Sequence, residues 1–271
     1  MIADFRAARG TLIATGVLAL LIVAAAAAPL IAPFAFDALD LANRRGAPSS
    51  VHWFGTDELG RDLLTRVLFG ARVSLAVGLV SAAVSVAIGM TIGAAAGWFG
   101  RWLDAVLMRF TDAMLSVPRL PLLMIAAAVV GPSVGLLILM VGAAGWMETA
   151  RVVRVEVQSI KANDFVTAAR AVGATAFQIV TRHVLPGVLP TAAVATTLAV
   201  GRAILLESAM SFFGVGVQPP TASWGNMLYQ AQTTMSSEPW LGIFPGAFIF
   251  LTVLCCNVIG SSLTDVEHAH K

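Results

Sequence analysis

The chain has 271 residues, of which 58% are hydrophobic and 12% carry a charge. Soluble proteins average roughly 25% charged residues, so this composition excludes an ordinary soluble domain and indicates a membrane protein. The formal net charge of +2 is too small to indicate a nucleic-acid partner.

The first apolar run covers residues 11–36 and follows Arg6 and Arg9. Its alanines at 24–28 resemble a signal-peptidase site, so a cleaved signal peptide is the alternative to a membrane anchor. The run is too long for the apolar region of a signal peptide and long enough to cross a bilayer. We therefore predict an uncleaved span over residues 11–34, with its N-terminus held in the cytoplasm by the two arginines.

The polar segment 37–72 follows, and we expect it on the outer side of the membrane. It contains the run HWFGTDELGRD at residues 52–62. Within this run, Asp57 is predicted to cap a turn and Arg61 to pair with a carboxylate. Residues 62–71 have an amphipathic helical pattern, which predicts a helix lying along the outer membrane surface.

The second predicted span, residues 73–98, carries a stripe of small residues. Lipid provides no hydrophobic drive for helices to associate, and small residues allow the close approach on which helix packing in membranes depends. We therefore predict that this helix is buried in a bundle and contacts a neighbour through the stripe. The stripe repeats every four residues and consists of Ser81, Ser85, Gly89, Gly93 and Gly97.

Four further apolar runs predict spans 3 to 6. An even number of spans places both termini in the cytoplasm, and the loop 214–239, which has no Lys or Arg, faces outward. The arginines in segment 37–72 depart from this charge rule. The chain then divides into residues 1–72, with an anchor span and an interfacial helix, and a five-span core, residues 73–271. The four runs are residues 120–130, 134–146, 189–213 and 240–263, and residues from Met114 onward help the first of them to cross.

The stretch 151–190 is polar, and its arginines place it in the cytoplasm. Capping signals predict two short helices in it. The first helix ends at Gly173, because glycine favours the left-handed C-cap conformation. The second begins at a capping box and ends before a proline and a glycine that cannot continue it. The first helix is predicted to start at Asn163 and Asp164, the capping box consists of Thr175 and Gln178, and the stop consists of Pro186 and Gly187.

Two charged residues, Arg202 and Glu207, lie inside the predicted fifth span. A charge at the centre of a membrane helix costs about 2.5 to 3.5 kcal/mol unless it is relieved. Counted from Leu189, Arg202 is about 20 Å and Glu207 about 27 Å into this span. Arg202 therefore needs a partner or a wet cavity. Glu207 is predicted at the outer end of the helix, paired with a neighbouring span or placed beside a pathway.

The sequence offers no catalytic or metal-binding set. A phosphate-binding loop needs a Gly-rich turn that ends in Gly-Lys-Ser/Thr, and neither Lys161 nor Lys271 stands in one. We therefore expect that the chain hydrolyses no ATP and holds no cofactor. His52 has no second histidine or cysteine nearby with which to hold a metal. Cys255 and Cys256 adjoin within an apolar run, which is typical of buried small hydrophobic residues.

Part of the stretch 151–190 resembles the EAA loop of the inner-membrane subunits of binding-protein-dependent ABC importers. The resemblance rests on Thr167-Ala168-Ala169, on Gly173 and on Leu185-Pro186. In that family the loop forms a coupling helix that docks into a groove on the ATPase subunit. Thr167 stands where the family most often has Glu, and His183 where it has an aliphatic residue. The resemblance implies ATPase-coupling roles for Asp164, Phe165, Thr167, Ala168, Ala169, Gly173, Phe177, Leu185 and Pro186, with side chains such as Phe165, Val166 and Phe177 buried on docking.

Two more blocks agree with this resemblance. The run at residues 52–62 is similar to the segment before the second span of C-type permeases in dipeptide, oligopeptide and nickel importers, and residues 206–214 are similar to the family's fifth span. The resemblance implies an all-α, six-span permease of the type I ABC importer fold in the bacterial inner membrane. It also implies a second permease subunit, two ATPase subunits that bind ATP and Mg, and an extracytoplasmic substrate-binding protein.

The resemblance gives Arg202 and Glu207 a place beside the translocation path, and we expect Arg202 to meet the carboxylate of a passing peptide. A permease for nickel or metal chelates is the alternative within the family. A self-sufficient secondary transporter would need paired repeats with broken helices, and a membrane-embedded enzyme would need a catalytic set. The sequence favours neither.

Overall fold

The computed structural model describes residues 2–131 and 133–269, with side-chain burial given for residues 9–131 and 133–264. Helices make up most of this part of the chain, and the one β-bridge reported there is an isolated contact between Thr56 and Asp62. The predicted all-α membrane fold is thus confirmed. The side chain of Arg6, which the sequence assigns to the cytoplasm, lies outside the described residues.

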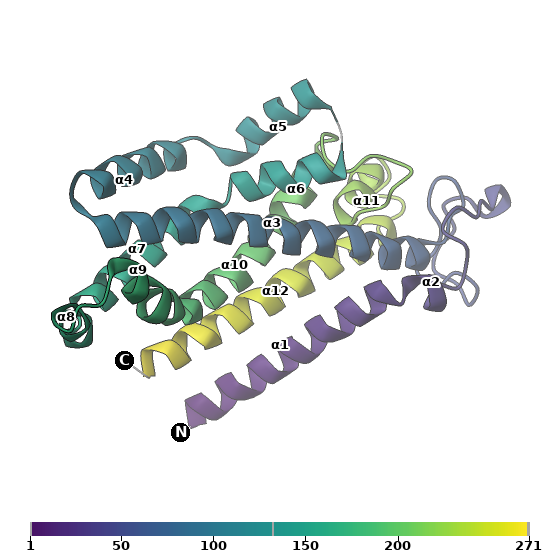
Figure 1. The fold of residues 1–271 in the computed structure, drawn as a ribbon. Helices are drawn as coiled ribbons and strands as arrows, with labels where there is room; N and C mark the ends of the chain where they lie inside the picture. Colours follow the sequence, from purple (N-terminus) through teal and green to yellow (C-terminus); the bar gives the residue numbers. More distant parts are fainter. Residues whose placement is uncertain (1, 132, 270–271) are drawn as a thin grey trace.

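Four long helices form the body of the molecule, and Figure 1 shows them running along one direction. Each is long and apolar enough to cross a membrane. Two further pairs of helices also qualify as spans when each bent pair is counted as one, which gives four to six spans. The long helices are α1 (Ile2–Ala26), α3 (Leu63–Phe99), α10 (Leu185–Phe212) and α12 (Trp240–Ala269). The bent pairs are α4 (Arg101–Ser116) with α5 (Arg119–Val130), and α6 (Val134–Ala143) with α7 (Trp146–Ala162).

The two bent pairs correct the prediction of simple third and fourth spans. Helices α4 and α5 meet at 82°, because Pro118 holds the preceding Val117 in an extended conformation. Helices α6 and α7 meet at 41°, so Trp146 begins a new helix where the prediction ended the fourth span. At this bend a Cβ on Gly145 would lie 2.7 Å from Oγ of Ser85, which explains why the chain has a glycine there.

The first span also ends earlier than predicted. Helix α1 ends at Ala26, and a separate short helix, α2 (Ala28–Ile31), follows. Pro29 accounts for the break because a proline ring cannot donate a backbone hydrogen bond to the preceding turn.

The predicted interfacial helix at residues 62–71 is wrong. These residues are helical, but they form the first turns of α3, whose N-cap is Asp62 with a hydrogen bond from the Thr65 amide (2.8 Å). The basic residue on this stretch, Arg66, does not face water, because its side chain is 1% exposed. It contacts Asp57 (Nε to Oδ2, 3.4 Å). The polarity of these turns therefore serves a protein contact and not a membrane surface.

The run at residues 52–62 folds as a tight loop beside α3. Asp57 Oδ1 accepts hydrogen bonds from the amides of Leu59 and Arg61 (both 2.9 Å), and Nε of Arg61 donates to Asp57 Oδ2 (2.7 Å). The predicted capped turn with an Arg–carboxylate pair is confirmed. Gly60 has φ +75°, and a Cβ there would lie 1.8 Å from the carbonyl oxygen of Asp40, so the loop closes only over glycine.

The small-residue stripe of α3 lies against α7. A Cβ on Gly89 would come within 2.7 Å of the Trp146 carbonyl oxygen, and one on Gly93 within 2.4 Å of the Ala150 carbonyl oxygen. Farther along, a Cβ on Gly97 would lie 2.8 Å from the Arg154 carbonyl oxygen. Backbone therefore approaches backbone over about two turns, which only glycine permits.

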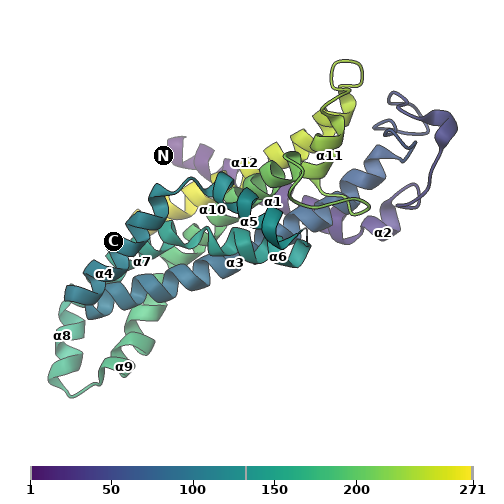
Figure 2. The same cartoon turned by 90° about the horizontal axis from the view of Figure 1, so that it is seen from above.

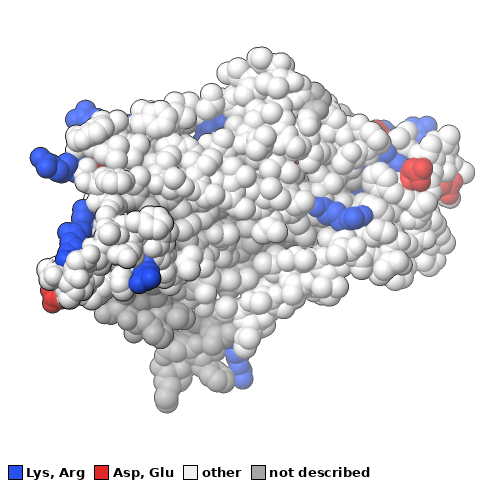
Figure 3. Space-filling model, viewed as in Figure 1, with Lys and Arg blue, Asp and Glu red and all other residues white. Residues whose placement is uncertain are grey.

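The molecule has two different ends. Figures 1 and 2 show that the start of α1 and the end of α12 lie at the same end as α8 (Asp164–Ala171) and α9 (Ala176–Ile179). The opposite end carries α2, the segment up to α3, and α11 (Trp224–Ala231). In Figure 3 most charged side chains lie toward these ends, and the surface between them is largely uncharged. This distribution fits a bundle whose middle is in lipid.

The close contact between α3 and α7 makes a testable prediction. Gly93→Ala should destabilise the protein by about 1 to 3 kcal/mol, because the new methyl group overlaps the Ala150 carbonyl oxygen. Gly16→Ala in α1 is the matched control, since no atom lies within 4 Å of a Cβ there. Thermal unfolding of the detergent-purified protein measures both. A Gly93→Ala protein as stable as the Gly16→Ala protein would contradict the packing.

Candidate functional sites

The polar stretch between α7 and α10 forms a helix pair, α8 and α9, that projects from one end of the bundle (Figure 2). Gly173 turns the chain between them with φ +88°. The amide of Gly173 donates to the Arg170 carbonyl and the amide of Ala174 to the Ala169 carbonyl, both at 3.0 Å, which closes the end of α8 in the manner of a Schellman motif. The predicted glycine corner is present.

The second helix begins at the predicted capping box. The Thr175 hydroxyl accepts a hydrogen bond from the Gln178 amide (3.3 Å), and Oε1 of Gln178 accepts one from the Thr175 amide (2.8 Å). These two bonds satisfy amides that a helix start leaves unpaired.

The predicted stop at Pro186 and Gly187 is wrong. The chain continues through a π-helical turn, Val180–Val184, directly into α10 at Leu185. Pro186 lies in the first turn of α10, the part of an α-helix where proline is best tolerated. The fifth span therefore begins before Leu189, and Leu185 and Pro186 belong to its first turn.

The helix pair has a buried face and an exposed face. Val166, Ile179 and Val184 are each 1% exposed and pack on α7. Val166 was predicted to be buried by a partner, but its own chain already buries it. The exposed face carries large apolar side chains at high exposure: Phe165 47%, Phe177 77% and Val172 86%. Phe177 and Val172 lie mostly in water, and Phe165 is half-exposed beside the His183 ring. Together these side chains mark a surface suited to docking.

The other predicted residues of the helix pair divide between these faces. Asp164, Thr167 and Ala168 are exposed, and Ala169 is half-buried against the core under the pair. Two basic side chains contact the end of α3: Lys161 of α7 donates to the Trp98 carbonyl (2.5 Å), and the guanidinium of Arg170 of α8 lies 5.5 Å from the Trp98 ring.

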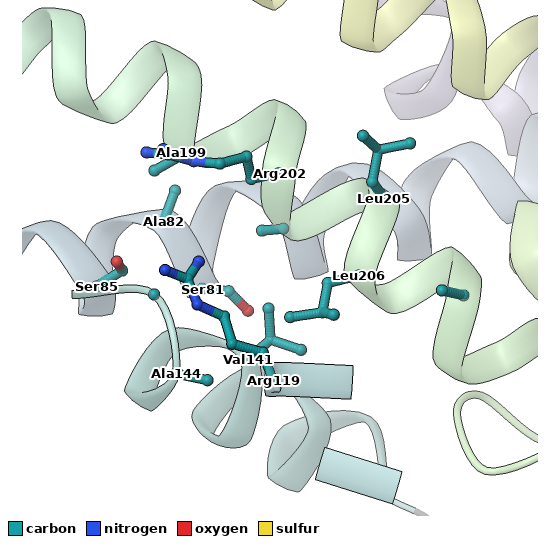
Figure 4. A pocket seen from close by; sticks show the side chains of 13 residues that line it. Ser81, Ala82, Ser85, Arg119, Val141, Ala144, Ala199, Arg202, Leu205 and Leu206 are labelled. Atoms are coloured by element: carbon teal, nitrogen blue, oxygen red, sulfur yellow. The ribbon is translucent and has the colours of Figure 1, made fainter. Parts of the chain in front are cut away.

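A second candidate site lies between the spans, in a cavity of about 280 Å³ whose lining includes Ser81, Ser85, Arg119 and Arg202. Figure 4 shows Arg119 entering from α5 and Arg202 lying on the α10 wall, with the two serines on α3. Both arginines share one carboxylate, that of Glu148 in the first turn of α7. Nη2 of Arg119 donates to Oε1 (2.8 Å), and Nη1 of Arg202 donates to Oε2.

Arg202 thus has both the partner and the cavity that its place within a span requires. Sequence analysis missed Glu148, although it adjoins the apolar run of the predicted fourth span, where an ionisable residue is itself a signal of function. The structure brings it to Arg202 because the α6–α7 bend turns the first turn of α7 toward α10.

Glu207 lies apart from this cavity. Its side chain is fully buried and accepts hydrogen bonds from the hydroxyls of Ser74 (3.2 Å), Ser211 (2.8 Å) and Ser208 (3.4 Å). Ser74 belongs to α3, so Glu207 contacts a neighbouring span through a hydroxyl. Its location beside a pathway stays a prediction.

The histidine and cysteines singled out in the sequence have structural surroundings. His52 lies 3.0 Å from Asp62 (Nδ1 to Oδ1) and stacks on Phe34. Cys255 and Cys256 are buried free thiols, as predicted.

Together, the spans, the projecting helix pair and the charged cavity define a multi-pass helical membrane protein of transporter architecture. The family model for the binding-protein-dependent transport system inner membrane component matches residues 89–267. The chain belongs to this family and is therefore an inner-membrane protein.

Characterised relatives cover most of the chain. It is 40% identical to the oligopeptide transport system permease protein OppC of Escherichia coli (strain K12) over 96% of this chain and 86% of the relative. It is 38% identical to the dipeptide transport system permease protein DppC of Bacillus subtilis (strain 168), over 92% and 78% respectively. Identity to DppC of Alkalihalophilus pseudofirmus is 37%, over 88% and 78%.

The two faces of the helix pair lead to different predictions for protein stability. Val166→Ala should destabilise the protein by at least about 1.5 kcal/mol, since it removes buried methyl groups and leaves a cavity. Phe177→Ala should leave stability unchanged because the ring lies in water. Hydrogen exchange of the helix pair in the detergent-purified protein measures both, and equal effects of the two variants would refute the assignment of faces.

Proposed function

We propose that this chain is the C-type permease subunit of an ABC importer for di- and oligopeptides, forming half of the translocation pathway. The exposed apolar tip of the helix pair is the observation that carries the coupling role, and the names of the relatives support the peptide substrate. The partners we propose are a second permease subunit, two ATPase subunits and an extracytoplasmic substrate-binding protein.

We assign the end with the helix pair to the cytoplasm. The start of α1 and the end of α12 lie at that end, so both termini would be cytoplasmic. The stretch around the helix pair carries Arg151, Arg154, Lys161, Arg170 and Arg182, in accord with the preference of basic residues for the cytoplasmic side.

The helix pair transmits the work of the ATPases. In this proposal, ATP and Mg bind to the ATPase subunits, and this chain contributes the docking surface. Moving a two-state equilibrium from 1:99 to 99:1 requires about 5.5 kcal/mol. Burial of Phe165, Val172 and Phe177 at about 1.5 to 3 kcal/mol each is of this order, provided that the ATPase groove holds them better in one state than in the other.

The cavity at Arg202 is the proposed substrate contact. A guanidinium presents a planar fork of donors that matches a carboxylate, and every peptide with a free C-terminus carries one. The two arginines outnumber the single carboxylate of Glu148, so the cavity keeps an excess positive charge that favours an anionic group.

Gly173 provides a test of the coupling role. A Cβ at this position would meet no atom within 4 Å, so a substitution acts only through the backbone. Gly173→Val should abolish the left-handed corner and uncouple ATP hydrolysis from uptake, because β-branched residues avoid positive φ. Gly173→Asn is the matched control, since asparagine tolerates this conformation. Both rates are measured in proteoliposomes with the whole importer, and normal coupling in Gly173→Val would refute the role.

Arg202 provides a test of the substrate contact. Arg202→Ala should lower peptide uptake about tenfold, the equivalent of about 1.4 kcal/mol, while the importer stays assembled. Arg202→Lys retains the charge but not the fork, so we expect an intermediate rate. Uptake of a labelled peptide is the measurement, with co-purification of the subunits as the control for assembly. Unchanged uptake in an assembled Arg202→Ala importer would remove Arg202 from the pathway.

A further inference from the structure

Arg202 lies on the border of two cavities. The first is the cavity of about 280 Å³ that also holds Arg119, and it follows residues 199–209 of α10. The second has about 550 Å³, is lined by Glu148 as well as Arg202, and follows residues 191–202. Since α10 begins at the helix-pair end, the second cavity lies on that side of Arg202 and the first on the opposite side.

The bridge Arg119–Glu148–Arg202 therefore links the two linings: Arg119 lines the first cavity, Glu148 the second and Arg202 both. It joins three separate elements, with one residue each from α5, α7 and α10. The side chains are 26% exposed for Arg119, 38% for Glu148 and 43% for Arg202. They are thus reachable from the cavities, as a replaceable partner must be.

We propose that this bridge is a latch between the two cavities and that a substrate carboxylate opens it by taking the place of Glu148 on Arg202. The inference rests on the proposed peptide substrate. Exchange of one carboxylate for another leaves the charge balance of Arg202 unchanged. A solute without a carboxylate would have to separate Glu148 from Arg202 and leave a guanidinium unpaired within a span, which is costly.

Arg119 gives the displaced carboxylate a second partner. Because Oε1 of Glu148 already accepts a hydrogen bond from Arg119, Glu148 stays paired when the substrate takes Arg202. The two arginines and two carboxylates then balance. Arg119 is in this sense a positioning residue, and the latch needs both arginines.

Helix α7 connects the latch with the helix pair. Glu148 lies in its first turn, and its C-cap, Asn163, immediately precedes α8. A displacement of the helix pair is thus carried by one continuous helix to the carboxylate of the latch, so the same element bears on both cavities and on the docking surface.

The test uses the whole importer in proteoliposomes and compares a tripeptide with its C-terminal amide. Glu148→Gln should raise the ratio of amide to free-acid uptake about tenfold over that of the unaltered importer, because no charge pair then has to be broken. The extracytoplasmic substrate-binding protein is the same in every preparation, so its own preference between the free acid and the amide cancels from this comparison.

Asp104→Asn is the matched control. It removes the carboxylate partner of Arg154, which lies on α7 as Glu148 does, and neither Asp104 nor Arg154 lines either cavity. The uptake ratio should not change. An assembled and active Glu148→Gln importer with the unaltered ratio would overturn the latch.

Arg119→Gln provides a second test of the latch, which should lower uptake of the free acid and not raise that of the amide. This variant serves as the test if the Glu148→Gln importer fails to assemble. Without Arg119 the displaced Glu148 loses its second partner, so uptake of the free acid should fall about tenfold and the amide should stay excluded. Undiminished uptake of the free acid by this variant would overturn the role of Arg119. An unaltered importer that hydrolyses ATP but carries neither peptide would instead refute the proposed substrate.

Discussion

The glycine contact between α3 and α7 is the constraint on which the other features depend. Both helices carry apolar side chains that lipid solvates as well as protein does, so hydrophobic burial gives no reason for them to pair. Their pairing comes from backbone approach at Gly89, Gly93 and Gly97, with Arg154 of α7 also bound to Asp104 of α4. Since α7 carries Glu148 at its start and the helix pair at its end, this contact determines where both candidate sites lie.

The chain places charges in its apolar body in two different ways. The side chain of Glu207 is buried among serine hydroxyls where α3, α10 and the start of α11 meet. Ser74 also accepts a hydrogen bond from the backbone amide of Trp224. That arrangement links Glu207 through Ser74 to α3 and to the start of α11. The side chain of Glu148 is 38% exposed and lines a cavity together with Arg202. The two carboxylates therefore differ in burial, since Glu148 is accessible to solvent and Glu207 is not.

Local sequence signals were reliable wherever the interaction is itself local. The capping box at Thr175, the left-handed corner at Gly173 and the turn at Asp57 each involve residues a few positions apart, so propensity and spacing are sufficient to predict them. Predictions failed where a local signal competes with tertiary contacts. Pro186 predicts a helix end, yet a π-helical turn leads the chain into α10, and the polar turns that begin α3 are buried by the loop at Asp57.

By itself, the sequence determined the membrane class, the helical fold, the helix pair and the family resemblance, because these follow from composition, periodicity and motifs along the chain. It also showed that Arg202 needs a partner. Only the tertiary structure decided which partner: Glu148 is distant from Arg202 in sequence, and it meets Arg202 and Arg119 through bends at Pro118 and before Trp146. The angle of a bend depends on what packs across it, and no local pattern encodes that.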